Sequence, residues 1–423
     1  MSTLTDEEAA CRAAATAAPD SAAAHAALAR ELERLGRDDE AEHCYRTCIR
    51  LSPEDAAYHY ALGDIYLRRG SLAAAAPSFQ AAVDADPHHV AAMHKLAFLA
   101  DARKDAARAN ALFTKILTLQ PGFLQARMDY MQMLVTHGRA PDAIAVGHAG
   151  AQWMDAQDAV PDDDYRKLLG LTATLLKLRG ETQAAAACYR RVIARAPGDA
   201  AARHLLAALE GTLTYEHARD HARQEFDNYA ATFEHRLLKD LGYRAPHILA
   251  ERLWRLRPNP DALPRVLDLG CGTGLVAAEL SARYRLTCNV GIDLSRAMLA
   301  EAAKRGLYHE LINGDAAEVM ASRSDAFDLI VAADVFIYIG DVSAIFAQAA
   351  RLLTPGGILA FSVETAAHDG IELSTSGRYR HSASYIYELA YTSNLDLLRL
   401  DPGAIRSEMG QDVSGLYAYL TKN

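Results

Sequence analysis

The chain has 423 residues, of which 51% are hydrophobic and 23% are charged, and its formal net charge is −10 at pH 7. This length favours two domains, and the composition is typical of a globular protein. The acidic balance argues against a dedicated nucleic-acid binder, which usually presents a basic face, and no apolar run approaches the ~20 residues of a membrane span.

The N-terminal segment and the cysteines bear on the cellular compartment. Residues 1–8 include three acidic side chains and lack a signal-peptide pattern, so we expect a cytoplasmic protein. The six cysteines form no C-x-x-C pair and no spacing suited to zinc. We therefore expect reduced structural thiols and no metal site.

A 34-residue period runs through the first half of the chain. Pro53, Pro87 and Pro121 recur at this spacing. Small and then aromatic residues recur in the same phase, at Ala41, Ala75 and Ala109 and at Tyr45, Phe79 and Phe113. Small residues let two antiparallel helices approach, the aromatic side chain packs between them, and proline ends the second helix. The period and the pattern are those of tetratricopeptide repeats.

The array should contain about five such repeats. The fourth is degenerate because Gly147 stands in the aromatic position, whereas the fifth is clear again. The spacing across these two repeats exceeds two periods by eight residues, and we place the extra length in the acidic stretch 156–164. A last helix over 199–210 would cover the end of the array, so the first domain is expected to span residues 1–211.

Stacked repeats of this kind form a superhelix whose concave face is lined by the first helix of each repeat. By repeat position this face carries a mixed-charge set with two aromatic residues: Arg30, Tyr60, Asp64, His94, Phe98 and Asp101. These residues predict a groove for a protein or carrier partner, and no membrane or nucleic-acid partner is expected. The alternative is an array that only packs against the second domain.

A polar joint over residues 211–221 leads to an aromatic stripe. Phe226, Tyr229 and Phe233 occupy positions i, i+3 and i+7, which form one face of a helix. Such a stripe usually packs a helix on a core, here that of a second domain spanning residues 212–423.

The second half is organised around residues 266–274, which read V-L-D-L-G-C-G-T-G. The apolar run that breaks into alternate glycines, followed by a helical pattern, predicts a strand, a tight turn and a helix. A dinucleotide fingerprint would read G-x-G-x-x-G and would hold a pyrophosphate at the helix start. Here the glycines read G-x-G-x-G, and Asp268 just before them would repel a pyrophosphate and attract a cationic ligand.

Further acidic residues follow at the ends of the next predicted strands. Asp293 lies 25 residues after Asp268, and Asp315 and Asp334 close the two strand patterns beyond it. Ligands of open α/β sheets bind at the carboxyl ends of the strands. The ordered series resembles the motifs of class I S-adenosylmethionine-dependent methyltransferases.

This resemblance implies S-adenosyl-L-methionine as the cofactor. It assigns the methionine end of the cofactor to the glycine loop, the ribose hydroxyls to Asp293 and the adenine amino group to the vicinity of Asp315. The residues that it implicates are Asp268, Gly270, Cys271, Gly272, Gly274, Asp293, Leu294, Met298, Asp315, Ala316 and Asp334. Lid helices over residues 222–256 would add Tyr229, and Arg244 would lie near the cofactor carboxylate.

The C-terminal segment extends the resemblance to a bacterial group of predicted methyltransferases with N-terminal tetratricopeptide repeats. That group shares the run R-Y-R-H-S, here residues 378–382, and the ending R-x-E-x-G-x-x-V-x-G. By position, Arg378 and Tyr338 are the expected substrate-binding residues. Tyr379 and His381 are the expected catalytic ones, His381 as a general base because an unperturbed imidazole has a pKa of about 6.5. A solvated basic loop is the alternative for this run.

We therefore expect an all-α tetratricopeptide superhelix, then a Rossmann-like domain whose mostly parallel seven-stranded sheet has an antiparallel last strand. The resemblance implies methyl transfer to an O or N atom of an acceptor that the repeats recruit, a protein side chain or a carrier-bound metabolite. Residues 334–338 lack the (N/D)-P-P-(Y/F) motif of amide and adenine N-methyltransferases, which disfavours that chemistry. The alternatives are a small-molecule methyltransferase whose repeats serve only assembly, and a non-catalytic repeat scaffold.

Overall fold

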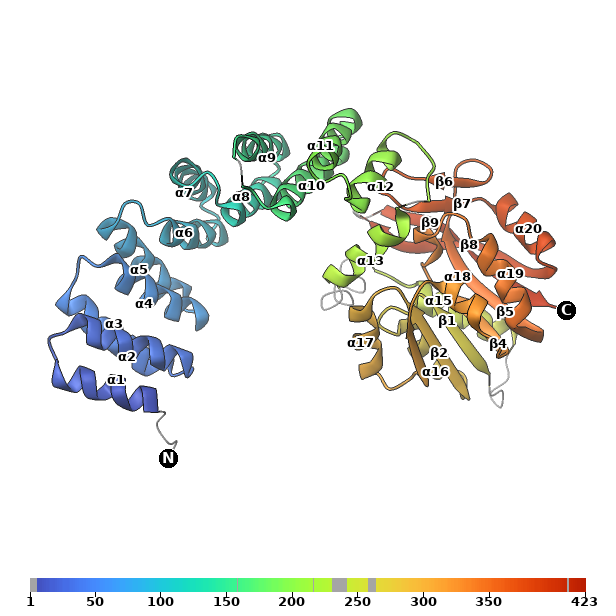
Figure 1. The fold of residues 1–423 in the computed structure, drawn as a ribbon, viewed down its shortest axis with the longest axis horizontal. Coiled ribbons are helices and arrows are strands. Elements are labelled where there is room, and N and C mark those ends of the chain that lie inside the picture. Colours follow the sequence, from blue (N-terminus) through green and yellow to red (C-terminus); the bar gives the residue numbers. More distant parts are fainter. Residues whose placement is uncertain (1–5, 158, 216, 230–241, 258–263, 409–410) are drawn as a thin grey trace. The chain divides into compact units, whose positions relative to one another are not determined.

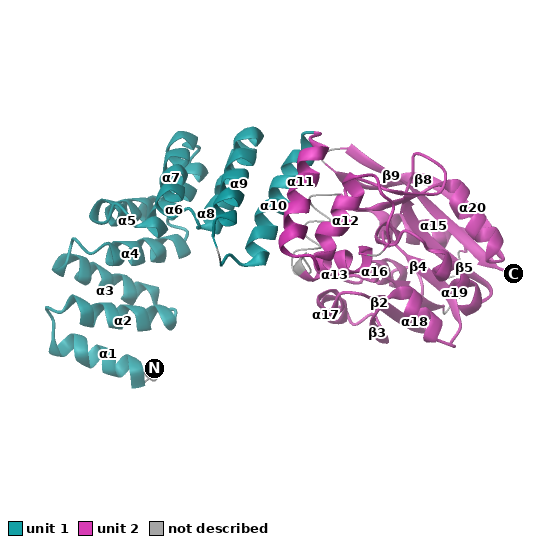
Figure 2. Ribbon diagram, turned by 45° about the horizontal axis from the view of Figure 1, so that its top comes forward, with its two compact units in different colours: residues 1–179 teal, residues 180–423 magenta. Residues whose placement is uncertain are grey.

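The computed structural model describes residues 6–423 except 158, 216, 230–241, 258–263 and 409–410 (Figure 1). The chain forms two compact units, residues 1–179 and 180–423 (Figure 2). No helix in the described part of the chain is long and apolar enough to cross a membrane.

Unit 1 consists of helices that follow one another in repeated pairs. Their bounds are α1 Asp6–Ala17, α2 Ala22–Arg34, α3 Asp38–Leu51, α4 Ala56–Arg68, α5 Leu72–Ala85, α6 Val90–Ala102, α7 Ala106–Leu119, α8 Leu124–Thr136, α9 Ala140–Asp155 and α10 Asp162–Leu178. The first helices of four successive pairs begin at residues 22, 56, 90 and 124, which confirms the 34-residue period.

The predicted packing positions lie in the core of unit 1. The small and aromatic repeat residues are all buried: Ala41, Tyr45, Ala75, Phe79, Ala109 and Phe113. A Cβ atom on Gly63 of α4 would lie 2.8 Å from the ring of Phe79 in α5. The small residue therefore allows the two helices to approach closely.

The degenerate fourth repeat is packed through glycines. A Cβ atom on Gly147 of α9 would lie 2.2 Å from Oγ1 of Thr172 in α10, and one on Gly150 would lie 2.4 Å from Cδ of Arg127 in α8. Arg127 is buried and donates a 2.9 Å hydrogen bond to the carbonyl oxygen of Val146. The missing aromatic side chain is thus replaced by close backbone approach on both sides of α9.

The extra length of this region is spread over two helices and their loop. Helix α9 has 16 residues and α10 has 17, against 14 in α7 and 13 in α6. The loop between α9 and α10 spans residues 156–161 and overlaps the predicted stretch. The two longer helices were not predicted, because a helix can gain a turn without any change in its apolar pattern.

Unit 2 begins with helices and continues into a sheet. The helices are α11 Thr182–Arg195, α12 Ala200–Leu209, α13 Ala218–Tyr229 and α15 Ala245–Leu256. The elements that follow are β1 Arg265–Leu269, α16 Leu275–Ser281, β2 Cys288–Asp293, α17 Arg296–Lys304, β3 Glu310–Asn313, α18 Ala316–Ser322, β4 Phe327–Ala332, the 3₁₀ helix η2 Phe336–Tyr338, α19 Ser343–Leu352, β5 Leu353–Glu364, β6 Ile371–Leu373, β7 Tyr379–His381, α20 Ala383–Thr392, β8 Leu395–Glu408 and β9 Gln411–Lys422. Helices α11 and α12 thus share a compact unit with the sheet, and the domain boundary after residue 211 stays a prediction.

The seven-stranded sheet has the order β3-β2-β1-β4-β5-β9-β8. Strands β1 to β5 pair in parallel, and β9 runs antiparallel to β5 and to β8. This arrangement confirms the predicted fold. Strands β6 and β7 form a separate hairpin.

Both faces of the sheet are apolar. Leu267 and Phe361 belong to the layer formed with α19 and α20, whereas Val266 and Ile358 belong to the layer formed with α15 and α16. Successive residues of β1 and β5 thus alternate between the two layers, as the pleat requires. Because both faces are covered, we expect a ligand site beyond the carboxyl ends of the strands.

Candidate functional site

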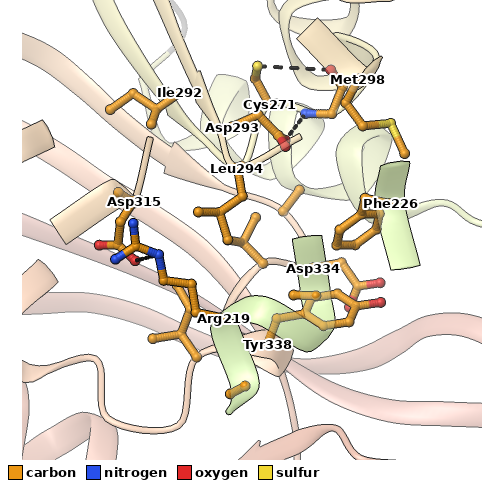
Figure 3. Close-up of a pocket in the computed structure, with 18 of the residues that line it drawn as sticks. Arg219, Phe226, Cys271, Ile292, Asp293, Leu294, Met298, Asp315, Asp334 and Tyr338 are labelled. Carbon is orange, nitrogen blue, oxygen red and sulfur yellow. Dashed lines mark hydrogen bonds and ion pairs between the residues drawn. The ribbon is translucent and has the colours of Figure 1, made fainter. Parts of the chain in front are cut away.

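A cavity of about 410 Å³ lies in unit 2, where β1, β2 and β4 reach their carboxyl ends (Figure 3). Most of its surface is apolar. Its charged lining side chains are Arg219, Asp293, Asp315, Asp334, Asp341, Arg378 and Arg406. The expected residues Gly270, Cys271, Gly272, Leu294, Met298, Ala316 and Tyr338 also line it.

The loop after β1 brings main chain to the cavity wall. Gly270 has a φ of 58°, in the left-handed region that favours glycine. A Cβ atom on Gly270 would lie 2.6 Å from Cγ2 of Val335, which lines the same cavity. Glycine is therefore required here both for the backbone conformation and for space.

Asp293 ends β2 and faces the cavity (Figure 3). Its Oδ2 accepts from the N–H of Gly272 and its Oδ1 from the N–H of Ser295, each at 2.8 Å. Burial raises the pKa of Asp293, and these two N–H donors oppose that rise. Each carboxylate oxygen keeps a second acceptor position, so the group has capacity for two further hydrogen bonds from a ligand.

Asp315 lies immediately before α18 and caps this helix. Its Oδ1 accepts from the N–H of Ala317 at 2.9 Å, and its Oδ2 lies 4.0 Å from Nε of Arg219 in α13 (Figure 3). Leu294 and Met298 add apolar surface to the same cavity. The carboxylate is thus held in place by the helix start while it faces the cavity.

Asp268 in β1 is buried and does not line the cavity. Its Oδ2 accepts from the hydroxyl of Tyr308 at 2.7 Å, and its Oδ1 has no hydrogen-bond partner among the described residues. Burial raises the pKa of Asp268 to about 7, although the Tyr308 hydroxyl opposes the rise. An unpaired buried carboxylate oxygen is costly, so one further donor would complete the group.

Asp334 follows β4 and has an unusual backbone. Its φ is 58°, which residues other than glycine rarely adopt. The N–H of Asp334 donates to Oγ of Ser362 at 2.9 Å, and its carboxylate accepts from Nη1 of Arg406 at 3.0 and 3.1 Å. Such held, sparsely populated conformations collect at functional sites, and Asp334 lines the cavity.

The guanidinium of Arg406 in β8 is buried and shared by three carboxylates. Besides Asp334, it donates to Glu364 and, from Nε, to Glu408 at 2.7 Å. Glu408 also accepts from Nη1 of Arg378. Burial alone would raise the pKa of Glu408, but the guanidinium groups of Arg378 and Arg406 hold it below its ordinary value. This network connects β8 to the end of β4 and to Arg378.

Sequence reasoning missed Arg406, Glu364 and Glu408 as part of this region. The R-x-E spacing of Arg406 and Glu408 could have indicated that both side chains lie on one side of a strand, because alternate residues of a strand share one face. Tyr308, the half-buried partner of Asp268, had no sequence signal, since it lies outside every motif.

The expected catalytic residues, Tyr379 and His381, do not line the cavity. Tyr379 and His381 are fully buried; the hydroxyl of Tyr379 donates to the carbonyl oxygen of Thr214, and Nε2 of His381 lies 2.7 Å from the carbonyl oxygen of Gly340. Burial lowers the pKa of His381, which favours the neutral ring. Alternation along β7 turns both side chains inward, so the geometry gives them packing positions instead of the expected contact with a substrate.

Two further expected residues lie outside the cavity lining. Arg244 is exposed at the start of α15, and Gly274 stands at the start of α16. Tyr243, next to Arg244, does line the cavity, and its hydroxyl donates to the carbonyl oxygen of Ala333 at 3.4 Å. Tyr243 therefore lies at the cavity, and a contact of Arg244 with the cofactor carboxylate stays a prediction.

The predicted lid is described in part. Helix α13 lines the cavity through Arg219, Ala222 and Phe226, and the ring of Phe226 lies 4.9 Å from that of Tyr338 (Figure 3). The side chain of Tyr229 and the whole of Phe233 lie outside the described residues.

The cysteines are free thiols in the structure. Cys271 lines the cavity, and burial raises its pKa, so it stays a neutral thiol. Within the described ranges, no group of three or more His, Cys, Asp or Glu side chains is arranged to hold a metal ion.

Comparison with known families agrees with this geometry. Residues 266–357 match a family model described as a methyltransferase domain, and residues 26–90 match one described as a tetratricopeptide repeat. The first half of the chain is thus similar to tetratricopeptide repeats and the second half to a methyltransferase domain. The first match runs from β1 to the start of β5, the part of the chain that supplies Gly270, Asp293, Asp315 and Asp334.

Two curated relatives share part of the chain. A malonyl-[acyl-carrier protein] O-methyltransferase of Legionella pneumophila is 33% identical over 142 residues, which are 32% of this chain and 47% of that protein. A trans-aconitate 2-methyltransferase of Deinococcus radiodurans is 37% identical over 106 residues, 25% of this chain and 39% of that protein. The chain thus spans about half the length, or less, of these relatives.

A solved structure of similar topology is the N-methyltransferase NodS from Bradyrhizobium japonicum in complex with S-adenosyl-L-homocysteine. It is 20% identical to this chain with a TM-score of 0.38, and the match covers 47% of this chain and 97% of that one.

Proposed function

We propose that this protein is an S-adenosylmethionine-dependent methyltransferase that transfers a methyl group to an O or N atom of an acceptor recruited by its repeats. The acceptor would be a protein side chain or a carrier-bound metabolite. The observation that carries the proposal is one cavity shared by the Gly270 loop, Asp293 and Asp334. A methyl donor and an acceptor must occupy one water-poor space for the transfer to occur.

The residues present fit S-adenosyl-L-methionine. Asp293 has acceptor positions left for two ribose hydroxyls, and Asp315 would accept from the adenine amino group. The methionine part would lie along the Gly270 loop, where the unpaired Oδ1 of Asp268 suits an ammonium donor. When bound, this cofactor supplies an electrophilic methyl group on a positively charged sulfur.

Within this proposal we favour oxygen as the accepting atom. The name of the Legionella relative states an O-methylation. Residues 334–338 lack the motif that serves amide and adenine N-methylation. The role left to the protein is to orient the acceptor and to exclude water, and the contact between Phe226 and Tyr338 would help to close the cavity.

We also propose that residues 1–211 recruit the acceptor and that residues 212–423 perform the transfer. Phe98 of the predicted partner face exposes 61% of its surface, which suits an aromatic anchor for a partner. His94 and Asp101 of the same face are paired within the array, with Asp129 at 2.8 Å and His137 at 2.7 Å.

The other predicted face residues differ in what they offer a partner. Tyr60 stacks on His89 with ring centroids 5.1 Å apart, and Asp64 lies 2.9 Å from Nζ of Lys95. Arg30 is exposed. Phe98 and Arg30 are therefore the members of this face best placed for new contacts.

Transfer from a radiolabelled cofactor tests both proposals. Full-length protein, S-[methyl-³H]adenosylmethionine and a cell lysate are incubated, and label is counted separately in macromolecules and in small molecules. We expect label above that of an Asp293→Ala control, and less macromolecular label with Phe98→Ser. Label that is unchanged by Phe98→Ser would favour repeats that serve only assembly, and no label above the control would contradict the enzyme.

A further inference from the structure

Building on the function proposed above, we infer that the acceptor is an organic acid whose carboxylate binds Arg378 and Tyr338 and itself receives the methyl group. Both residues line the cavity. The inference narrows the accepting oxygen to one chemical class.

Around Arg378 and Tyr338 the cavity contains hydrogen-bond donors that have no acceptor among the described residues. Arg378 has one hydrogen-bond partner among the described residues, Glu408, although a guanidinium carries five N–H donors. The hydroxyl of Tyr338 has no partner within the described part of the chain. A ligand group that only accepts hydrogen bonds complements both, and a planar carboxylate matches the guanidinium fork.

The carboxylates near Arg378 have other cationic partners. Asp334, Glu364 and Glu408 all accept from the guanidinium of Arg406, and Glu364 also lies 3.5 Å from Nε of Arg380. Among the described carboxylates Arg378 donates to Glu408 alone, which leaves N–H donors of Arg378 for a ligand. The apolar cavity surface formed by Phe226 and Ile339 suits the hydrocarbon part of an organic acid.

Two carboxylates line the cavity near Arg378, and they differ in their partners. Asp334 is paired with Arg406, whereas Asp341 accepts through Oδ1, from the N–H of Ser343 at 2.9 Å and the hydroxyl of Tyr385 at 3.1 Å. An alcohol or an ammonium group must lose a proton to react, whereas a carboxylate needs no base. Its oxygen forms the new bond to the methyl carbon, the carbon–sulfur bond breaks with its electron pair left on sulfur, and no proton moves.

The order of the strands places Arg378, where we propose that the acceptor carboxylate binds, apart from Asp293 and Asp315, which we propose for the cofactor. Asp293 ends β2, and Asp315 follows β3 at one edge of the sheet. Arg378 instead contacts Glu408 of β8, the strand at the opposite edge. The rival occupant of Arg378 is the carboxylate of the cofactor itself, and the experiment distinguishes the two.

The test is calorimetry on full-length protein saturated with S-adenosylhomocysteine. Hexanoate and its neutral analogue hexanamide serve as probes, with Arg378→Met, Arg378→Lys and the control Arg380→Met. Arg380 lies two residues away, binds Glu372, lies 3.5 Å from Oε2 of Glu364 and does not line the cavity. Glu408 keeps its 2.7 Å bond to Arg406 in the Arg378 variants, which should preserve the fold.

We expect hexanoate to bind the wild type and Arg380→Met at least about ten-fold more tightly than hexanamide, and this preference to vanish in Arg378→Met and to weaken in Arg378→Lys. S-adenosylhomocysteine affinity should be unchanged in all three variants. Equal binding of the two probes, including no binding of either, overturns the inference. So does a loss of S-adenosylhomocysteine affinity in Arg378→Met, which would assign Arg378 to the cofactor.

Alkali treatment of the labelled product gives an independent result. A carboxyl methyl ester hydrolyses in mild alkali and releases volatile labelled methanol, whereas N-methyl groups and ethers keep their label. We expect volatile label from the lysate product. Alkali-stable label would overturn the carboxylate acceptor but leave the methyltransferase proposal standing, whereas a wild type that binds no S-adenosylhomocysteine would contradict the methyltransferase itself.

Discussion

Nε2 of His204 lies 2.7 Å from the carbonyl oxygen of Gly377, the residue before Arg378. A Cβ atom on Gly377 would lie 2.9 Å from Cδ2 of Leu205, so the turn packs tightly on α12. The hydroxyl of Tyr379 donates to the carbonyl oxygen of Thr214 on the other side of Arg378. Helix α12 and the joint after it therefore hold the turn that carries Arg378 into the cavity.

Replacing His204 should disturb Arg378 without touching the cofactor residues. We predict that His204→Ala weakens hexanoate binding several-fold, because the turn loses its anchor, while S-adenosylhomocysteine affinity is unchanged. His204→Gln, whose amide can donate the same bond, should recover most of the loss, and the exposed Arg203→Ala serves as the control. Calorimetry with equal hexanoate affinity in His204→Ala and the wild type would show that the contact does not position Arg378.

Gly270→Ala should abolish measurable binding of S-adenosylhomocysteine. The new methyl group would meet Val335 at 2.6 Å in the cavity wall, and alanine would have to adopt a φ of 58°. Gly306→Ala is the matched control, because Gly306 has a φ of 65° and its added Cβ atom would meet nothing within 4 Å. Calorimetry should show near-normal affinity for Gly306→Ala only. Equal affinities in the two variants would contradict the assigned position of the loop.

Arg406→Met should strongly destabilise unit 2. It leaves Asp334, Glu364 and Glu408 without their shared cation, and an uncompensated buried charge costs about 3–5 kcal/mol. Arg399→Met, which removes an exposed arginine from the same strand, should cost under about 1 kcal/mol. Urea unfolding can be followed through Trp254 once Trp153 of unit 1 is replaced by Phe. If Arg406→Met lowered the free energy of unfolding as little as Arg399→Met does, the network would not stabilise unit 2 as we propose.

Asp268 should make stability fall as pH rises. Its pKa is about 7 in the folded protein and ordinary when unfolded, so between about pH 4 and pH 7 the folded state holds a proton that the unfolded state has lost. Stability should therefore drop by up to ~1.4 kcal/mol per pH unit relative to Asp268→Asn. Unfolding of both proteins at pH 5 and pH 7, read at Trp254, measures this difference. If the difference in stability between the wild type and Asp268→Asn were the same at pH 5 and pH 7, Asp268 would be ionised in the folded protein at both pH values.

Asp268→Ala should also abolish measurable binding of S-adenosylhomocysteine while the repeats stay folded. The substitution removes the carboxylate that we propose for the ammonium group of the cofactor, since its Oδ1 has no hydrogen-bond partner among the described residues. Calorimetry measures the affinity, and circular dichroism reports the helices of unit 1. Unchanged affinity would contradict the place given to Asp268 in the site.

The glycine loop and the acidic residues at the strand ends could be predicted because local patterns determine them. The motif around Gly270 and the acidic residues Asp293, Asp315 and Asp334 each follow an apolar strand, and parallel strands bring their carboxyl ends together. The repeat period likewise fixed the first helices of the array, since each repeat has the same packing demands.

The residues around the proposed binding site of the methyl acceptor could not be predicted in the same way. Tyr379 and His381 were expected to face a substrate, but the alternation of a three-residue strand decides which side chains turn inward, and sequence alone left that phase open. The buried partnership of Arg406 with Asp334 joins residues 72 positions apart, which no local pattern encodes. The anchoring of Gly377 by His204 depends on how α12 packs, and repeat periodicity does not specify it.

The most direct test of the central claim is a calorimetric titration of the full-length protein with S-adenosylmethionine and S-adenosylhomocysteine, beside Asp293→Ala. We predict micromolar binding of both by the wild type, ~ −8 kcal/mol, and a loss of at least about ten-fold in Asp293→Ala. Failure of the wild type to bind either compound would contradict the methyltransferase account and favour a repeat scaffold.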